Sequence, residues 1–256
     1  MSKTPIRFDR LTDVSNPGFY SNLKITNNAT TPLSKLDITA NTITLTNSTG
    51  ESYDIRSLST TVDITILGLG GRSAGSEAIN TWYYIWVIGK DDMTVGAILD
   101  ISSTSPTLPA DYTFKHLVGT VRNNDSSNFL RYMQRNDLVL YQEVDSSRLV
   151  LNQGNATSYT NVSCGSFVPP ISNIAYLDAS IEQTTAGQRG GIDIRTPGLG
   201  SQHLAQSCSG AIGIPIHNNG YVVTNTSQQV EYKVDNIGLS STQRAYIYVS
   251  GYIVNI

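Results

Sequence analysis

The sequence predicts an all-β fold made of two antiparallel β-sandwich domains, jelly-roll-like in type, behind a short N-terminal arm. Apolar residues recur at every second position in many short segments, which is the period of a strand with one buried face. Only 14% of the 256 residues are charged, and Ser, Thr, Asn and Gly, which favour turns, supply much of the polar surface. No segment of ten or more residues has the period of an amphipathic helix.

Many short strands separated by turn signals are typical of sandwiches and barrels. The sequence predicts strands over residues 41–46, 53–56, 58–67, 81–88, 93–99, 115–122, 128–133, 137–141, 147–151, 157–163, 173–182, 190–195, 210–216, 228–234 and 244–255. The glycine-rich segment Gly68–Gly75 lies between two of them and lacks the Lys-Ser/Thr of a phosphate-binding loop. It is therefore predicted to be a flexible connection.

The segment Thr81–Ile88 is apolar at nearly every position and contains both tryptophans of the chain. Trp82 and Trp86 fall on one face of the predicted strand, and Ile85 and Val87 fall on the other. A strand with two apolar faces is covered on both sides. These four residues are therefore predicted to belong to the structural core.

A break in the strand pattern divides the chain into domains. Residues 21–141 are predicted to form the first β domain and residues 157–256 the second, and both lengths fit a single domain. The segment 142–156 interrupts the alternation and is predicted to be a linker. Residues 1–20 are polar and contain Asn16-Pro17-Gly18, which predicts an arm outside the core. Such arms are commonly loose unless a neighbouring molecule holds them in place.

The last predicted strand, residues 244–255, is apolar on both faces. Tyr246, Tyr248 and Tyr252 fall on one face, opposite a face of small and aliphatic residues. Two interpretations remain open. The strand is either central in a sandwich, with tyrosine hydroxyls that reach solvent at the rim, or part of a contact between subunits, where tyrosine is enriched. The second interpretation predicts these three tyrosines as an oligomer interface.

The composition argues against several classes of function. A net charge of −3 and a pI near 5.5 give no basic patch for nucleic acid, and no apolar stretch approaches the ~18 residues of a membrane span. The N-terminus has no signal-peptide pattern, so synthesis in a cytoplasm is expected. Cys164 and Cys208 could form a disulfide or remain buried free thiols, and both alternatives stay open.

The sequence predicts no catalytic, cofactor-binding or metal-binding residue. His116, His203 and His217 lack the short spacing of zinc ligands. The segment His217–Gly220 has the composition of a turn, so His217 is expected there. No nucleophile elbow of the Gly-x-Ser-x-Gly type is present.

A glycosidase would need two carboxylates at a defined separation. Asp178, Glu182 and Asp193 are the candidates, but surface acids occur in any β protein. Glu182 and Asp193 flank a predicted hairpin, and Arg189 or Arg195 could pair with them there. Salt bridges are therefore the expected role of these carboxylates.

The connection between those two strands is rich in hydroxyl and amide groups. Gln183, Gln188 and Arg189 are its candidate ligand-facing residues, because such groups can hydrogen-bond a polar ligand. Three tyrosines near loops could stack on a sugar, although packing or capping is the expected role of each. They are Tyr112, Tyr159 and Tyr221.

Several segments of the chain resemble β modules of tailed-phage and prophage virion proteins. The segments that carry the resemblance are Asn80–Ile88, Ser105–Tyr112, Val118–Asn123, Phe129–Gln134, Gly165–Pro170, Ile192–Arg195 and Ile247–Tyr252. The resemblance covers most of the chain and consists of scaffold residues, so it transfers no catalytic residue. The chain departs from many tail fibres in having no long repetitive shaft.

The resemblance implies a non-enzymatic structural protein on the surface of a virion, assembled as a homotrimer. A tail-fibre or receptor-binding appendage that contacts the host cell, through a surface glycan for instance, is expected first. A capsid decoration or head-fibre protein and a free lectin-like carbohydrate-binding module are the alternatives, followed by a polysaccharide-degrading enzyme. The arm is expected to bind other virion proteins. No cofactor, nucleic-acid partner or membrane insertion is expected.

Overall fold

The computed structural model describes residues 19–142, 145–183, 189–200, 204–209, 216–237 and 243–256. All strand pairs within these ranges are antiparallel, and the same ranges contain one 3-10 turn, η1 (Asp145–Arg148), and no α-helix. The prediction of an all-β antiparallel protein is confirmed. The strands are β1 (Tyr20–Ser21), β2 (Lys24–Asn27), β3 (Lys35–Thr46), β4 (Ser52–Asp63), β5 (Thr81–Gly89), β6 (Val95–Asp100), β7 (Phe114–Asn123), β8 (Tyr132–Arg135), β9 (Leu138–Tyr141), β10 (Leu149–Gly154), β11 (Thr160–Ser163), β12 (Ile174–Gln183), β13 (Arg189–Arg195), β14 (Leu204–Ser209), β15 (Ile216–Val223), β16 (Gln229–Ile237) and β17 (Gln243–Ile253).

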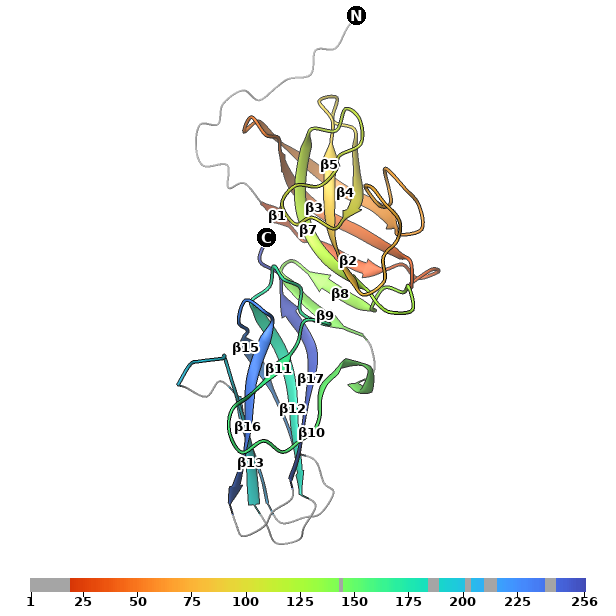
Figure 1. The fold of residues 1–256 in the computed structure, drawn as a ribbon. Helices are drawn as coiled ribbons and strands as arrows, with labels where there is room; N and C mark the ends of the chain where they lie inside the picture. The colour runs from red at the N-terminus through yellow and green to blue at the C-terminus, as the bar shows by residue number, and fades with distance from the viewer. Residues whose placement is uncertain (1–18, 143–144, 184–188, 201–203, 210–215, 238–242) are drawn as a thin grey trace, which may run out of the picture.

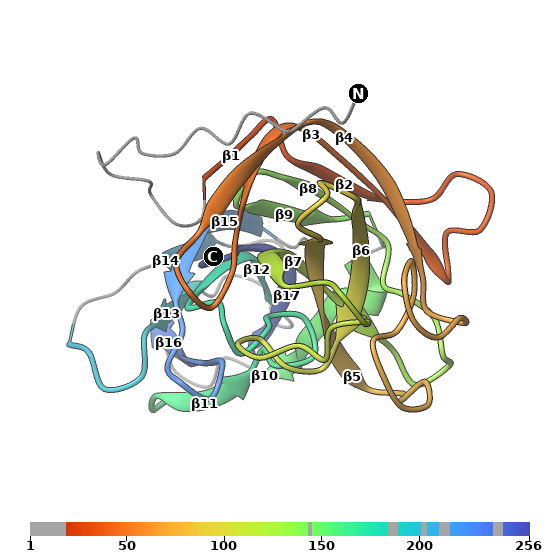
Figure 2. The same ribbon diagram turned by 90° about the horizontal axis from the view of Figure 1, so that it is seen from above.

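The strands form two lobes that share one sheet (Figure 1). β1–β7 belong to the first lobe and β10–β17 to the second. A 13-stranded sheet runs through both in the order β15-β12-β17-β9-β8-β2-β3-β7-β5-β6, with β1 and β4 on β3 and β10 on β17. The β8–β9 hairpin joins the lobes, because β8 pairs with β2 and β9 pairs with β17. Figure 2 shows β3 and β4 curving around one side of the first lobe.

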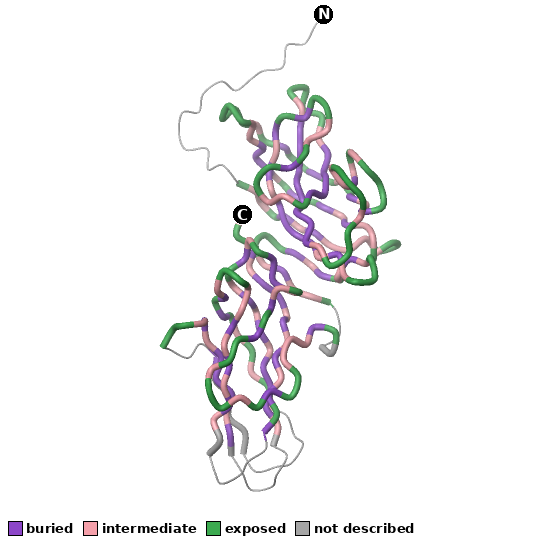
Figure 3. The backbone as a smooth tube through the Cα atoms, viewed as in Figure 1, coloured by how far each residue is buried: buried purple, intermediate pink, exposed green. Residues whose placement is uncertain are grey.

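A second sheet, in the order β11-β16-β13-β14, belongs to the second lobe. Alternate residues of β12 and β17 are buried and belong to the same apolar cluster as alternate residues of β13 and β16. They are Ala175, Leu177, Ala179, Ile181, Ala245, Ile247, Val249, Ile192, Ile194, Val230 and Val234. Figure 3 shows buried positions alternating with less buried ones along these strands, as the period of a strand requires.

Both faces of β5 are covered, and Trp82, Ile85, Trp86 and Val87 are all buried. Ile85 and Val87 lie in the main core, whereas Trp86 lies in a smaller cluster under the segment that follows β6. The indole Nε1 of Trp86 donates a hydrogen bond to the Ser102 carbonyl oxygen, 3.1 Å away. The segment 101–113 after β6, which contains Pro106 and Pro109, therefore covers the second apolar face of β5.

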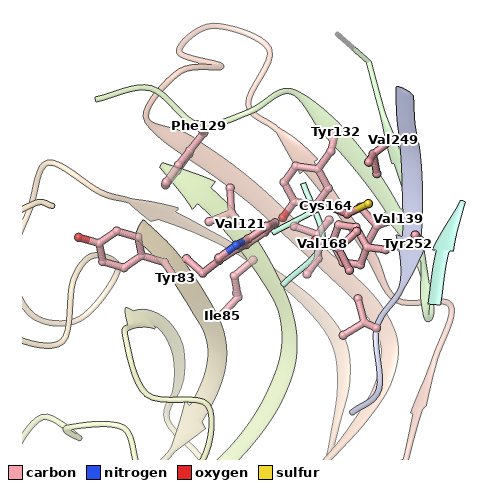
Figure 4. Close-up of a cluster of buried hydrophobic side chains, with 14 of the residues drawn as sticks. Tyr83, Ile85, Val121, Phe129, Tyr132, Val139, Cys164, Val168, Val249 and Tyr252 are labelled. Atoms are coloured by element: carbon pink, nitrogen blue, oxygen red, sulfur yellow. The ribbon is translucent and has the colours of Figure 1, made fainter. Parts of the chain in front are cut away.

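Trp82 shares a strand face with Trp86 but lies at the contact between the lobes. Its Nε1 donates to the Gly165 carbonyl oxygen at 3.0 Å, and its ring lies edge-on to the ring of Tyr252. The hydroxyls of Tyr252 and Thr120 are 2.8 Å apart and buried, and the Tyr141 hydroxyl donates to the Phe167 carbonyl oxygen at 2.6 Å. We call Trp82, Thr120, Tyr141, Phe167 and Tyr252 the junction cluster. Figure 4 shows Tyr252 among side chains of both lobes.

Part of the segment expected to be a linker is a strand. β10 pairs with β17 through Leu149 opposite Tyr248 and Gly154 opposite Ala245, with two register shifts between these pairs. Gln153 adds a positive φ of 54°. A strand with such irregularities has no clean alternation of polar and apolar residues. This explains why the sequence predicted only the short strand 147–151 inside a linker, whereas β10 continues to Gly154.

The His217–Gly220 segment was expected to be a turn, but it lies inside β15 and pairs with β12. A Cβ atom on Gly220 would lie 3.3 Å from the Leu204 side chain of β14, so the glycine allows the two strands to approach closely. Strand β14 was not predicted. The predicted strand 210–216 lies outside the described residues except for Ile216.

The glycine-rich segment Gly68–Gly75 is held along the outer edge of β6. The Gly70 amide donates to the Ala97 carbonyl oxygen at 2.9 Å, the Leu99 amide donates to the Gly71 carbonyl oxygen at 2.8 Å, and Ser73 donates to Leu99. The prediction of a flexible connection is wrong, because these bonds satisfy an otherwise open sheet edge.

Candidate functional site

The second lobe has an open sheet face lined by tyrosines. The inward residues of β12 and β17 pack on the second sheet, so the alternate residues of β12, β15 and β17 point the other way. We call this surface the outer tyrosine face. Its residues are Tyr176, Asp178, Glu182, His217, Asn219, Tyr221, Tyr246 and Tyr248. Tyr221 is 51% exposed, so the face leaves aromatic surface open to solvent.

Strand register places these side chains in rows across β12 and β15. Tyr176 is opposite Tyr221, and Asp178 is opposite Asn219. The two tyrosine rings are 4.9 Å apart between centroids, with an interplanar angle of 36°. The Tyr176 hydroxyl donates to Oδ1 of Asn219 at 3.0 Å. The aromatic row and the polar row are therefore linked by a hydrogen bond.

The acidic groups of the face have partners within the chain. His217 Nδ1 lies 3.3 Å from Asp178 Oδ1. The Tyr246 hydroxyl donates to Glu182 Oε1 at 2.9 Å, and Arg244 Nη1 lies 3.8 Å from the same oxygen. Burial and the bond to the Glu182 carboxylate both raise the pKa of Tyr246. The face consequently presents polar groups without a net excess of unpaired acid.

The three tyrosines predicted as an oligomer interface do not share a face. Tyr176 pairs with Gly251 and Leu177 pairs with Val249, so Ser250 is an extra residue that forms a β-bulge. A one-residue shift moves every following side chain to the other face. Tyr252 is therefore turned into the junction cluster and is only 1% exposed, and the prediction that it lines an open surface is wrong. Tyr246 and Tyr248, before the bulge, stay on the outer tyrosine face.

A buried arginine holds the bulge. Arg148 is at the end of η1, and its Nη1 donates to the Val249 carbonyl oxygen at 2.9 Å and to Ser250 Oγ at 3.0 Å. Bulges leave backbone groups outside the regular ladder, and a charged donor can satisfy them. The position of Tyr252 therefore depends on a residue from the segment that was expected to be a linker.

The predicted ligand-facing loop falls mostly outside the described residues, including Gln188. Gln183 is the last residue of β12, where it pairs with Gln243, and Arg189 is the first residue of β13, where it pairs with Ile237. β12 and β13 belong to different sheets and do not pair with each other, so the predicted hairpin is wrong.

Asp193 is buried in an ionic cluster, on the face of β13 turned away from Ile192 and Ile194. Lys233 Nζ is 3.2 Å from Asp193 and 2.8 Å from Asp235. Burial, followed by the neighbouring Asp235, raises the pKa of Asp193, whereas the hydrogen bond from Lys233 lowers that of Asp235. The carboxylates considered for a glycosidase pair are thus bound by local partners.

Of the three tyrosines considered for sugar stacking, one has a ring that is exposed to solvent. Tyr112 is buried with Trp86 in the smaller apolar cluster. The Tyr159 ring is covered by the Arg195 guanidinium, 3.4 Å from its centroid, and Arg195 also pairs with Glu231 at 2.8 Å. Tyr221 is half-exposed on a strand. Its partner Tyr176 was not predicted, because the contact depends on pairing between strands 45 positions apart along the chain at this row.

Among the residues whose side chains the structure describes, the remaining reactive groups form no common site. His116 is buried, its Nδ1 bonds a carbonyl oxygen of β3, and burial lowers its pKa. Cys164 is a buried free thiol with a pKa raised to about 12 by burial. Cys208 lies in β14, and His203 lies outside the described residues. Within the described ranges, no group of three or more His, Cys, Asp or Glu residues could hold a metal ion.

A shallow hollow of about 540 Å³ lies where β1 meets the β8–β9 turn. It is lined by Phe19, Tyr20, Ser21, Asn22, Asn136, Asp137 and Ile256. The Tyr20 hydroxyl donates to the Asp137 carboxylate, so the strongest polar groups of the hollow already bind one another. The outer tyrosine face is the better candidate.

Comparison with known protein families and curated sequences finds no relative of this chain. The chain matches no protein-family model, and no curated protein sequence is significantly similar to it. In the part of the chain that the structure describes, no helix is long and apolar enough to cross a membrane. Function is therefore inferred from the residues and the fold.

Proposed function

We propose that this chain is a non-enzymatic structural protein of a tailed-phage virion, a homotrimeric tail-fibre or receptor-binding appendage that contacts the host cell. The outer tyrosine face carries the proposal, because it presents exposed aromatic and polar side chains on a well-packed all-β body. The resemblance to phage β modules supports it. The resembling residues of β5 are buried scaffold residues, as a structural role requires.

The proposal includes two β-sandwich domains and an attachment arm. For the second domain, the support is one apolar core to which β12 and β17 contribute on one side and β13 and β16 on the other. For the first domain, the support is the pair of covered faces of β5. The arm, residues 1–20, binds other virion proteins. Residues 1–18 of it lie outside the described residues.

In the proposed trimer, Tyr246 and Tyr248 of β17 form the contact between subunits. Both are half-buried on an open sheet face, and tyrosine is enriched in protein interfaces. Burial of these two side chains, at the β17 side of the outer tyrosine face, would add apolar contact area that a single chain lacks and would leave β15 open. Without Tyr252 the predicted interface is smaller, and it depends on these two residues.

Light scattering of the purified protein at several concentrations tests the trimer. A mass near three times 27.8 kDa that persists on dilution is expected. A variant with Tyr246→Ser and Tyr248→Ser should be monomeric, whereas Tyr159→Ser on the opposite sheet should remain trimeric. A monomer for the unchanged protein would contradict the proposed assembly.

Antibody labelling of virions in the electron microscope tests the location. Label on the tail supports the appendage, and label on the capsid would replace it by the decoration or head-fibre alternative. No label on virions, together with a sugar-binding monomer, would favour the lectin-like alternative. Release of oligosaccharides from capsule or lipopolysaccharide would contradict the absence of enzymatic activity.

A further inference from the structure

We infer that the β12–β15 part of the outer tyrosine face binds a neutral sugar chain. This inference rests on the proposed role in host contact and gives that role a ligand class and a position. We call the site the sugar subsite. Its residues are Tyr176, Asp178, His217, Asn219 and Tyr221.

The subsite combines an aromatic surface with hydrogen-bonding groups one row away. Tyr176 and Tyr221 form a pair of rings with centroids 4.9 Å apart, and Tyr221 is half-exposed. The next row holds Asp178 and Asn219. A pyranose likewise has an apolar side and a polar edge. Its C–H groups can lie on an aromatic ring while its hydroxyls form hydrogen bonds at the edge.

The internal hydrogen bonds orient the polar groups and leave bonding capacity for a ligand. Asn219 uses Oδ1 to accept from Tyr176, and its amide nitrogen is a separate donor of two hydrogens. Asp178 uses Oδ1 toward His217 Nδ1, and its second oxygen is a separate acceptor. Donors and acceptors side by side suit vicinal hydroxyls, each of which both donates and accepts.

The charged groups around the subsite favour a neutral ligand over an acidic or a basic one. Asp178 is paired with His217, and the neighbouring Glu182 is paired with Arg244 and Tyr246. An acidic sugar would meet two carboxylates here, and a strongly basic peptide would have to compete with the existing partners. A neutral hexose chain meets neither obstacle.

The test measures binding of neutral oligosaccharides of glucose, galactose, mannose and N-acetylglucosamine to the full chain by calorimetry, with sialic acid and glucuronic acid oligosaccharides as charged comparators. We expect at least one neutral oligosaccharide to bind. Tyr221→Ala should weaken it at least tenfold and Asp178→Ala at least fivefold. Tyr159→Ala removes a tyrosine ring from the opposite face of the lobe and should change the affinity less than twofold.

The inference is overturned if no neutral oligosaccharide binds at millimolar concentration, if only charged ones bind, or if Tyr221→Ala binds as the unchanged protein does. The last result would move recognition to another surface, such as the predicted loop of Gln183 and Arg189. Circular dichroism of each variant ensures that lost binding is not lost folding. Virion labelling and solution mass are independent readouts, so a failed subsite with a labelled, trimeric protein leaves the proposed function standing.

Discussion

At the scale of single residues, Tyr132 and Tyr252 have buried hydroxyl groups in different environments. The Tyr252 hydroxyl lies 2.8 Å from that of Thr120, whereas the Tyr132 hydroxyl has no hydrogen-bond partner among the described residues. Loss of a buried bond leaves the other partner unsatisfied, which costs about 1–2 kcal/mol. Tyr252→Phe should lower the free energy of unfolding by about that amount, and Tyr132→Phe should leave it equal or raise it.

Urea denaturation of both variants measures the difference. The two substitutions remove the same atom from the same buried cluster, so each is the control for the other. A larger loss for Tyr132→Phe than for Tyr252→Phe would contradict the assigned hydrogen bonds.

His116 should make stability depend on pH. Burial lowers the pKa of His116 below its ordinary value of 6.5 in the folded chain. As the pH falls below 6.5, the unfolded chain takes up a proton that the folded chain does not. The free energy of unfolding therefore falls over this window, and the decline ends below the depressed folded pKa.

His116→Asn keeps a donor for the Thr44 carbonyl oxygen and removes the titrating group. As the pH drops from about 7.5 to about 4.5, the unchanged chain should lose more unfolding free energy than this variant does. Parallel stability curves for the two proteins would contradict this assignment.

At the scale of elements, β17 depends on Arg148 for its bulge. The Arg148 side chain is buried and bonds the Val249 carbonyl oxygen and the Ser250 hydroxyl. Arg148→Met keeps an apolar stem but removes the donors, and it should lower the free energy of unfolding by about 2 kcal/mol. Arg56→Met, on an exposed position of β4, should change it by less than about 0.5 kcal/mol. Equal effects in thermal or urea unfolding would contradict the role of the arginine.

The elements that the sequence predicted well are those with a strong apolar pattern. β5 is apolar at nearly every position, and β7 and β12 are rich in apolar residues. Each predicted bound of these three strands lies within one residue of the observed bound. β10 was predicted only in part and β15 was expected to contain a turn, for opposite reasons. The bulges of β10 break its alternation, while the turn-like residues of β15 are held extended by pairing with β12. Tertiary pairing overrides local preference in such strands.

The candidate site was predictable only along one strand. Tyr246 and Tyr248 follow from the alternation of β17, but the sugar subsite joins β12 to β15, and a single sequence does not give the register between distant strands. Tyr252 illustrates the same limit. Its face is set by an extra residue at Ser250, which leaves no mark in the alternation of side chains.

At the scale of the whole molecule, the shared sheet and the junction cluster should make the lobes unfold together. Trp82 contacts Gly165 and Tyr252 across the junction, and β9 pairs with β17. Calorimetry should show one transition, with a calorimetric enthalpy equal to the van't Hoff enthalpy. Trp82→Ala should destabilise the chain by about 3–5 kcal/mol or split the transition in two. Two transitions in the unchanged protein would contradict the coupling.

The bulge at Ser250 has a consequence for how this protein can evolve. The Ser250 side chain could be exchanged at modest cost, since its hydroxyl supplies one of two bonds to Arg148. Removal of the residue, or insertion of another beside it, would turn Tyr252 out of the junction and bring the following residues to the wrong side. Selection should therefore tolerate substitutions at position 250 but remove insertions and deletions in β17. Descendants of this chain should vary in the residue at this position and keep the same number of residues in the strand.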